Sequence, residues 1–209
     1  GKDKFYFISN EVEPGQQHFY QMDLNGKNKE KLTQKEGSYQ IHMSPNEESI
    51  VALYSNQNTP WELYSLDVKN GIETKITNST TAEFNGYPWR APGVTTFEAR
   101  DGAKVHARLY KNEETAKGGP AVIFVHGAGY LQNAHQWWSS YYREYMFHNI
   151  LADHGYTVLD VDYRGSAGYG RDWRTGIYRH MGGLDLSDQV DGVKFLVSDH
   201  GIDADKIGI

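Results

Sequence analysis

The sequence of 209 residues contains no cysteine, which excludes disulfide bonds, thiolate zinc sites and cysteine nucleophiles. It also lacks any apolar run near the roughly 20 residues that a membrane-spanning helix needs, so no membrane span is predicted. Runs of like charge are short, and the formal net charge is −6. That charge argues against nucleic acid or an anionic membrane surface as the main partner.

Several catalytic signatures are missing as well. No Gly-x-Ser-x-Gly nucleophile turn occurs, and Gly165-Ser-Ala-Gly168 has the wrong spacing. His-Glu-x-x-His, Walker and Gly-x-Gly-x-x-Gly patterns are absent, and the nine histidines show no metal-ligand spacing, so no metal or cofactor is predicted. The first residues carry neither an initiator Met nor a signal-peptide pattern, and we therefore expect the chain to begin inside a longer protein.

The first 85 residues contain an internal repeat. The matching segments are His18–Leu24 with Glu62–Val68 and Lys31–Thr33 with Lys75–Thr77, both at an offset of 44, and Phe7–Ser9 with Leu53–Ser55 at an offset of 46. Each unit alternates apolar and polar residues and turns at Asn25-Gly26 or Asn70-Gly71, which predicts hairpins. A period in the mid-forties built from short antiparallel strands is typical of β-propeller blades. Two blades cannot close a ring, so further blades are expected before Gly1.

Aromatic side chains recur within these units, and we predict that they pack between blades rather than contact a ligand. They are Tyr6, Tyr20, Tyr54, Trp61 and Tyr64.

Residues 85–93 hold two prolines and two glycines, the composition of a linker between domains. Beyond it, residues 94–99 and 104–110 flank an Asp-Gly turn and predict a hairpin. The apolar run Ala121–Val125 predicts a strand buried on both faces, as in a parallel sheet. A helix is predicted from His135 to His154, ended by Gly155, and a second buried strand from Tyr156 to Val161. This order predicts a strand–helix–strand unit.

From Asp162 to Gly183 no regular pattern holds, and the density of Gly, Arg and aromatic residues favours an ordered functional loop. Arg164 is expected to form a structural ion pair with Asp162 or another buried carboxylate. A second helix is predicted to present Leu186, Val190, Val193 and Val197 on one face, with Asp185 and Asp188 explained by the dipole of its first turn. Asp203–Ile209 then predicts a turn that enters a third buried strand.

The loop after the strand Ala121–Val125 is the candidate functional site. Gly127, Ala128 and Gly129 leave backbone N–H groups uncovered by bulky side chains at the carboxyl end of a strand. Exposed donors in that position can hold a developing oxyanion. The alternative is that small residues simply allow a strand to turn into a helix.

The order of motifs resembles the prolyl oligopeptidase family of serine peptidases, which includes enzymes like dipeptidyl peptidase IV and acylaminoacyl-peptidase. The resemblance rests on the propeller-like segment and on five motifs: Phe97–Gly102, Val125–Tyr130, Val161–Ser166, Gly183–Gln189 and Asp205–Ile209. It implies a mixed fold, with residues 1–85 as the last blades of a β-propeller and residues 86–209 as the first half of an α/β-hydrolase domain, truncated before the nucleophile turn. The catalytic Ser, Asp and His would all lie outside these residues.

In relatives, as the resemblance implies, the loop matching His126, Gly127, Ala128 and Gly129 stabilises the oxyanion. A Tyr side chain does this in some branches at the position of His126, so here a backbone donor near Ala128 is the favoured candidate. The usual third-position Gly is Ala128 and the usual fourth-position Pro is Gly129. Both differences from the family's usual pattern fall on the residues that would supply the backbone donor.

The resemblance therefore implies a serine peptidase, an exopeptidase or oligopeptidase that acts on short peptides by acyl transfer, with the fragment alone inactive. The implied partners are a peptide substrate and the rest of the same enzyme, with a homo-oligomer left open and a periplasmic or secreted location favoured over the cytoplasm. Two alternatives remain: an esterase or acyl hydrolase on the same fold, and a non-catalytic binding protein that uses the propeller as its platform.

Overall fold

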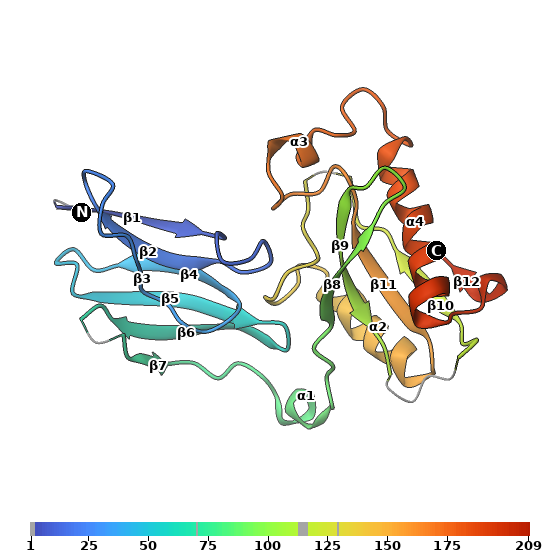
Figure 1. The fold of residues 1–209 in the computed structure, drawn as a ribbon. Helices are drawn as coiled ribbons and strands as arrows, with labels where there is room; N and C mark the ends of the chain where they lie inside the picture. The colour runs from blue at the N-terminus through green and yellow to red at the C-terminus, as the bar shows by residue number, and fades with distance from the viewer. Residues whose placement is uncertain (1–2, 70, 113–116, 129) are drawn as a thin grey trace. The chain divides into compact units, whose positions relative to one another are not determined.

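The computed structural model describes residues 3–69, 71–112, 117–128 and 130–209 (Figure 1). The chain divides into two compact units. The first comprises residues 1–89 together with 136–138, and the second comprises residues 90–135 and 139–209.

The first unit contains two antiparallel sheets. The strands of one are β1 (Lys4–Ser9), β2 (His18–Asp23) and β3 (Glu30–Lys31), and those of the other are β4 (Ser38–Met43), β5 (Ser49–Asn56), β6 (Thr59–Asp67) and β7 (Glu73–Lys75). In each sheet the strands lie in sequence order, β1-β2-β3 and β4-β5-β6-β7. The described strands form no closed ring, so the propeller remains a prediction.

The repeat seen in the sequence reappears as a repeated hydrogen bond. In the first sheet the Phe19 N–H donates to the Thr33 hydroxyl at 3.0 Å. In the second, 44 positions later, the Leu63 N–H donates to the Thr77 hydroxyl at 2.9 Å. The threonine after each outer strand therefore satisfies one backbone donor of the neighbouring strand.

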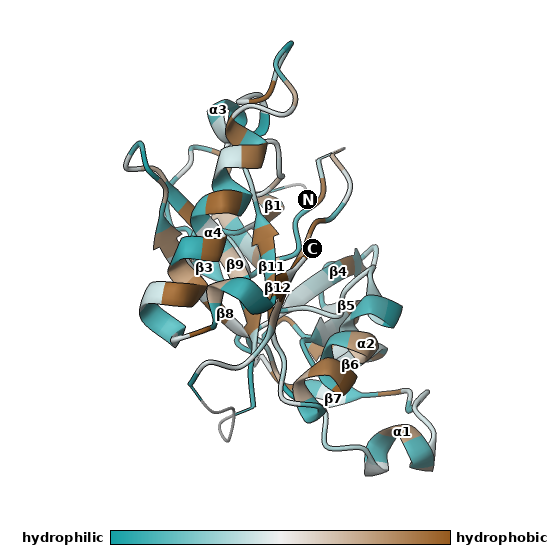
Figure 2. Cartoon of the chain, turned by 90° about the vertical axis from the view of Figure 1, so that its right-hand side faces the viewer, coloured by the Kyte–Doolittle hydropathy of each residue, from teal (hydrophilic) through white to brown (hydrophobic). Residues whose placement is uncertain are grey.

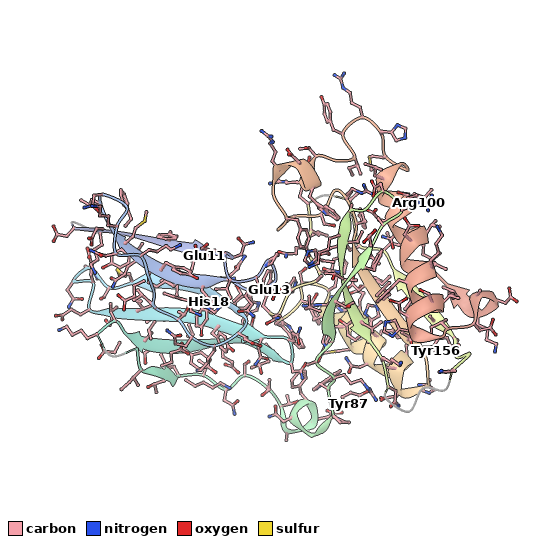
Figure 3. All side chains as sticks on the ribbon, in the orientation of Figure 1. Glu11, Glu13, His18, Tyr87, Arg100 and Tyr156 are labelled. Atoms are coloured by element: carbon pink, nitrogen blue, oxygen red, sulfur yellow. The ribbon has the colours of Figure 1, made fainter. Side chains whose placement is uncertain are left out.

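The residue before each of these donors is a buried polar side chain. His18 and Glu62 are each 1% exposed, and His18 lies in the strand region of this unit (Figure 3). The His18 ring nitrogen Nδ1 lies 3.3 Å from the Thr33 hydroxyl, and the Thr77 hydroxyl donates to Glu62 Oε2. The two sheets of the first unit thus each contain a buried polar side chain beside a threonine at the matching position. The hydrogen bond to the threonine gives each buried side chain a partner in place of water.

Aromatic packing fills the core of this unit. Tyr54 lies edge-on to Tyr64 with ring centroids 5.3 Å apart, and Tyr6 stacks on Phe19 at 5.8 Å. Each of these ring pairs joins neighbouring strands of one sheet, so packing between blades stays a prediction. The turn at Gly26 has the left-handed backbone (φ +78) that an Asn-Gly hairpin turn requires, whereas Asn70 of the matching turn lies outside the described residues.

Helix α1 (Ala82–Gly86) closes the first unit and was not predicted. Thr81 begins it by accepting a hydrogen bond from the Phe84 N–H at 3.1 Å, a side-chain cap that stabilises a short helix. The predicted linker of residues 85–93 therefore overlaps the end of a helix.

The second unit is built on a mixed sheet of order β12-β10-β11-β9-β8. Its strands are β8 (Gly93–Glu98), β9 (Lys104–Tyr110), β10 (Ala121–Phe124), β11 (Thr157–Asp162) and β12 (Ile207–Gly208), the last preceded by a short 3₁₀ helix over Ala204–Lys206. β10 pairs in parallel with β11 and β12, while β8 and β9 form the predicted hairpin around Gly102 (φ +83).

Two helices cover opposite faces of this sheet, α2 (Tyr142–Asp153) and α4 (Leu184–His200) (Figures 1 and 2). All six residues of β11 are buried because it is covered on both faces. Leu159 and Val161 belong to the core cluster that contains Leu196 of α4. β10, α2 and β11 thus form the predicted strand–helix–strand unit.

Helix α2 begins later than predicted. The expected helix started at His135, but α2 starts at Tyr142. The intervening backbone is committed elsewhere: the Gln136 N–H donates to the Gly15 carbonyl at 2.8 Å and the Trp138 N–H to the Ser55 hydroxyl at 3.1 Å, both within the first unit. Bonds of this kind replace the i to i−4 bonds that a helix would need.

Strand β10 is shorter and less buried than predicted. It ends at Phe124, and Val125 is 44% exposed. Only Ala121 and Ile123 are fully buried, so one face of this strand is covered less than the other. The third strand, β12, is likewise only partly buried.

The buried face of α4 also differs from the prediction. Leu186 and Val190 are exposed, whereas Asp188, Gly192 and Leu196 face the sheet. A Cβ on Gly192 would lie 3.2 Å from Leu159, so a glycine lets the helix approach β11 closely. The exposed side of α4 consequently alternates apolar and polar residues (Figure 2).

Candidate active site

The candidate loop lies where the parallel strands end. Gly208 of β12 pairs with Val122 of β10, and Phe124 of β10 pairs with Asp160 of β11, so the carboxyl ends of all three strands meet at one edge of the sheet. In α/β sheets, ligands bind in the crevice outside the carboxyl ends of the strands. The loop at His126 follows β10 directly, and Asp162 is the last residue of β11.

The side chain of His126 is part of the interior. It is 1% exposed, its Nε2 lies 3.1 Å from Asp162 Oδ1 and 3.2 Å from the Ser166 hydroxyl, and its Nδ1 lies 3.1 Å from the Gly127 carbonyl oxygen. The ring also stacks on Tyr163 with centroids 4.7 Å apart. His126 therefore fixes the loop from inside and presents no ring nitrogen to solvent.

Asp162 joins this histidine to the rest of the loop. Its Oδ1 accepts the Asn133 N–H at 2.7 Å, and its Oδ2 accepts the Ala134 N–H at 2.9 Å and the Tyr169 hydroxyl at 2.6 Å. The carboxylate is fully buried, and hydrogen bonds to an ionised acceptor are among the strong ones in proteins. Asp162 thereby holds both ends of the segment that contains the candidate loop.

A second carboxyl lies below the first on the same strand. Both oxygens of Asp160 accept from the Asn133 side-chain amide at 3.1 Å. Burial raises the pKa of Asp160 to about 7. Burial lowers the pKa of His126 and Asp162 raises it, and the influence of Asp162 prevails, so the pKa of His126 lies above its ordinary value.

The backbone donors of the loop differ in availability. The Gly127 N–H faces the Tyr141 hydroxyl at 3.3 Å. Within the described part of the chain, the Ala128 N–H has no hydrogen-bond partner, and Ala128 is exposed. The Tyr163 hydroxyl donates to the His126 carbonyl at 2.7 Å, so that carbonyl already has a hydrogen-bond partner. Gly129 lies outside the described residues.

A pocket of about 350 Å³ opens at this loop. Val125, His126 and Ala128 of the loop after β10 line it, and so does Ile209, which follows β12. Gln189 of α4 also lines it, with both polar atoms of its buried amide unpartnered among the described residues. Such groups are costly to leave unsatisfied, and a polar occupant of the pocket would satisfy them.

Arg164 lies beside the site in a structural ion pair. Its Nε lies 3.1 and 3.0 Å from the two oxygens of Asp188, its backbone N–H donates to Asp188 Oδ2 at 2.8 Å, and Nη1 reaches Asp101. The prediction of a buried carboxylate partner is confirmed, but the partner is Asp188 and not Asp162. The helix dipole alone therefore does not explain Asp188.

Several residues of this network were not anticipated from the sequence. They are Asn133, Tyr141, Tyr163, Ser166 and Tyr169. Tyr163, Ser166 and Tyr169 lie in the segment 162–183, where only the density of Gly, Arg and aromatic residues gave a signal, whereas Tyr141 lies inside the helix that was predicted to begin at His135. In the parts that the structure describes, no cluster of three or more His, Asp or Glu side chains suited to a metal ion was found, and no helix is long and apolar enough to cross a membrane.

Comparison with known proteins gives two family matches. The model of the prolyl oligopeptidase family matches residues 143–209, and that of the dipeptidyl peptidase IV N-terminal region matches residues 1–61. The matches fall in the second and first unit, respectively.

Individual relatives cover the whole chain. Dipeptidyl peptidase 8 of Homo sapiens is 27% identical over 98% of this chain and 24% of its own length. A probable dipeptidyl peptidase 4 of Trichophyton verrucosum is 28% identical over 100% of this chain and 28% of its own. The chain thus spans about a quarter of the length of these relatives.

A crystal structure of dipeptidyl peptidase 4 from Porphyromonas gingivalis shares the fold. It superimposes with a TM-score of 0.82 at 23% identity, over 99% of this chain and 29% of the other. The sequence matches and this fold agree with the order of motifs from Phe97 to Ile209. In sequence the chain is similar to the prolyl oligopeptidase family and, within it, to dipeptidyl peptidases.

Proposed function

We propose that this chain is part of a serine peptidase that cleaves short peptides by acyl transfer, as an exopeptidase or oligopeptidase. Residues 1–85 would be propeller blades and residues 86–209 the first half of an α/β-hydrolase domain. The names of the relatives, which are dipeptidyl peptidases, support release of dipeptides as the specific reaction. The triad Ser, Asp and His would lie outside these residues.

The observation that carries the proposal is the N–H of Ala128, which has no hydrogen-bond partner among the described residues and belongs to a residue that lines the pocket. An acyl-transfer site needs a preorganised donor that faces the point where the carbonyl oxygen becomes negative. Ala128 offers such a donor, and Gly127 offers a second if the Tyr141 hydroxyl moves aside. Because the loop is fixed by His126 and Asp162, the donor would need no reorganisation during the reaction.

The register of the sheet supports the position of the nucleophile. β12 runs parallel to β10 beside it, and Ile209 lines the same pocket as Ala128. A serine on a tight turn that continues β12 would therefore face the oxyanion loop, as in a nucleophile elbow. Serine would attack the scissile carbonyl, histidine would relay the proton, and aspartate would orient the histidine.

His126 would act in this reaction as a positioning residue. Its ring is enclosed by Asp162, Ser166 and Tyr163, so it cannot be the histidine that relays the proton. Its carbonyl and ring instead fix the backbone that leads to Ala128.

Active-site labelling tests the proposal. We expect a fluorophosphonate to modify one serine in the full-length protein that contains this chain, and peptide mapping to place that serine in a Gly-x-Ser-x-Gly turn after Ile209. Cleavage of a dipeptide amide bond would then separate the peptidase from an esterase, which would act on esters alone. A protein that stays unlabelled and cleaves nothing would support the non-catalytic binding alternative.

A further inference from the structure

A second pocket, of about 420 Å³, adjoins the candidate oxyanion loop. Ala128 lines both this pocket and the one described above, so the two meet at the same backbone. The other walls include Tyr130 of the loop after β10, Arg174 at the end of α3 (Arg171–Arg174), and Tyr178 and Arg179 of the segment that follows α3. We call these four residues together the basic aromatic pocket.

Each arginine of this pocket lies over an aromatic ring. The guanidinium carbon of Arg174 lies 4.1 Å from the ring centroid of Tyr130, and that of Arg179 lies 5.2 Å from the centroid of Tyr178. Stacking of this kind holds a planar guanidinium in place while leaving its N–H edge free for an anion.

Neither arginine is neutralised by the protein. Within the described residues, no carboxylate forms an ion pair with Arg174 or Arg179, whereas Arg164, Arg100 and Arg171 all have one. Two arginines with no carboxylate partner among the described residues thus lie in one pocket of a chain whose net charge is −6. They create a local field that attracts a carboxylate.

The backbone of the pocket is held in a defined shape. Tyr130 and Arg179 both adopt left-handed backbone, with φ of +69 and +59, which is uncommon for large side chains and concentrates at functional sites. The segment also packs tightly against Gly165, where a Cβ would come within 2.8 Å of Ile177. Gly165 donates its N–H to the Trp173 carbonyl at 2.9 Å, which joins the two walls.

We propose that the basic aromatic pocket binds the carboxylate end of the peptide on the leaving-group side of the scissile bond. This inference rests on the proposed peptidase function. A peptide substrate has a positive charge at its amino end and a negative charge at its carboxyl end, and two guanidinium groups would repel the first and attract the second. Substrates with a short leaving group and a free C-terminal carboxylate are therefore favoured.

The spacing of a peptide chain fits this arrangement. If the scissile carbonyl oxygen lies at the Ala128 N–H, the terminal carboxylate of a leaving group of one or two residues lies about 4 to 7 Å further along the chain. A carboxylate so close to Ala128 could lie in the basic aromatic pocket, because Ala128 lines that pocket as well. The arginines would thus select peptides by the length and charge of their leaving group.

The test compares four substrates in the full-length protein, three that differ only in the leaving group and a fourth with a side-chain carboxylate. The first three carry the dipeptide that the protein releases fastest, followed by alanine, by alaninamide or by an aminocoumarin. The fourth substrate ends in glutamyl amide, which has a side-chain carboxylate but no terminal one, and so tests whether the position of the carboxylate matters. We expect Arg174→Ala and Arg179→Ala each to raise KM for the alanine substrate about 5-fold or more, with KM for the alaninamide and aminocoumarin substrates unchanged.

Matched variants control this experiment. Arg171→Ala lies on the same helix but is exposed and paired only with Asp172, so it should change no substrate's KM. Arg174→Lys should restore part of the preference, because it keeps the charge. If Arg174→Ala and Arg179→Ala raised KM equally for the alanine and alaninamide substrates, or left both KM values unchanged, the proposed role of the pocket would be overturned. Cleavage and serine labelling of the wild-type protein would in that case leave the peptidase proposal standing. A wild-type protein that is neither labelled nor active would overturn both.

Discussion

Replacement of Asp162 by Asn tests the network that holds the candidate loop. Asp162 accepts four hydrogen bonds, two of them from the buried backbone N–H groups of Asn133 and Ala134. The amide nitrogen of Asn cannot accept, so whichever oxygen it replaces, at least one of these N–H groups loses its partner. One buried N–H would then be unsatisfied, and the remaining hydrogen bonds would be made to a neutral side chain in place of a carboxylate. We therefore expect the free energy of unfolding to fall by about 2 to 5 kcal/mol.

The same substitution changes the titration of His126. Asp162 raises the pKa of this histidine against the effect of burial, so in Asp162→Asn the pKa should fall below that in the wild type. A raised histidine pKa stabilises the folded state at pH values below the unfolded pKa, and this contribution is lost as pH rises through the folded pKa. The destabilisation caused by Asp162→Asn should therefore be larger at pH 5.5 than at pH 8.5.

Urea unfolding at both pH values and NMR titration of the His126 ring measure these effects. The matched control is Asp172→Asn, which alters an exposed pair with Arg171 and should change stability by less than about 0.5 kcal/mol. If Asp162→Asn were as mild as the control and left the His126 pKa unchanged, the proposed role of Asp162 would be refuted.

Three further substitutions probe other parts of the fold. Asp188→Ala removes the buried partner of Arg164 and should cost about 3 to 5 kcal/mol in urea unfolding; a loss below about 1 kcal/mol would contradict a buried ion pair. Because the pKa of Asp160 is raised to about 7, the folded state keeps a proton there that the unfolded state releases, so the contribution of Asp160 to stability falls between pH 4 and 7. Asp160→Asn should flatten that slope, and an unchanged slope would assign it to other groups. Thr77→Val leaves the Leu63 N–H without its acceptor and should cost about 1 to 3 kcal/mol, measured by the same unfolding assay.

The sequence predicted the elements that depend on simple periodicity or on turn chemistry. The hairpin around Gly102, the buried strand β11 and the repeat of the first unit all follow from local patterns. The apolar and polar residues of these segments recur with the periods typical of strands and turns, so the local sequence suffices to predict the elements.

The face of α4 shows why other features escaped prediction. Hydrophobic spacing favours Leu186 and Val190, yet the buried face contains Asp188 and Gly192. Asp188 is buried where it pairs with Arg164, which lies 24 positions earlier in the chain. Gly192 is buried because the helix approaches β11 closely at this point. Both reasons are tertiary contacts that periodicity does not encode.

The candidate loop has one feature that the sequence predicted and one that it could not predict. Its small residues identified the segment, and stabilisation of an oxyanion by the Ala128 N–H stays a prediction. The enclosure of His126 by Asp162 and Ser166 could not be predicted, because these residues are brought together only when β10 and β11 pair.

Replacement of the Ala128 amide by an ester tests the central claim most directly. Incorporation of lactic acid at position 128 of the full-length protein removes the N–H and leaves the methyl side chain in place. If this N–H stabilises the oxyanion, kcat should fall about 10² to 10³-fold with KM little changed. A kcat equal to that of the wild type, in protein that still reacts with fluorophosphonate at the wild-type rate, would contradict the assignment of Ala128 to the reaction.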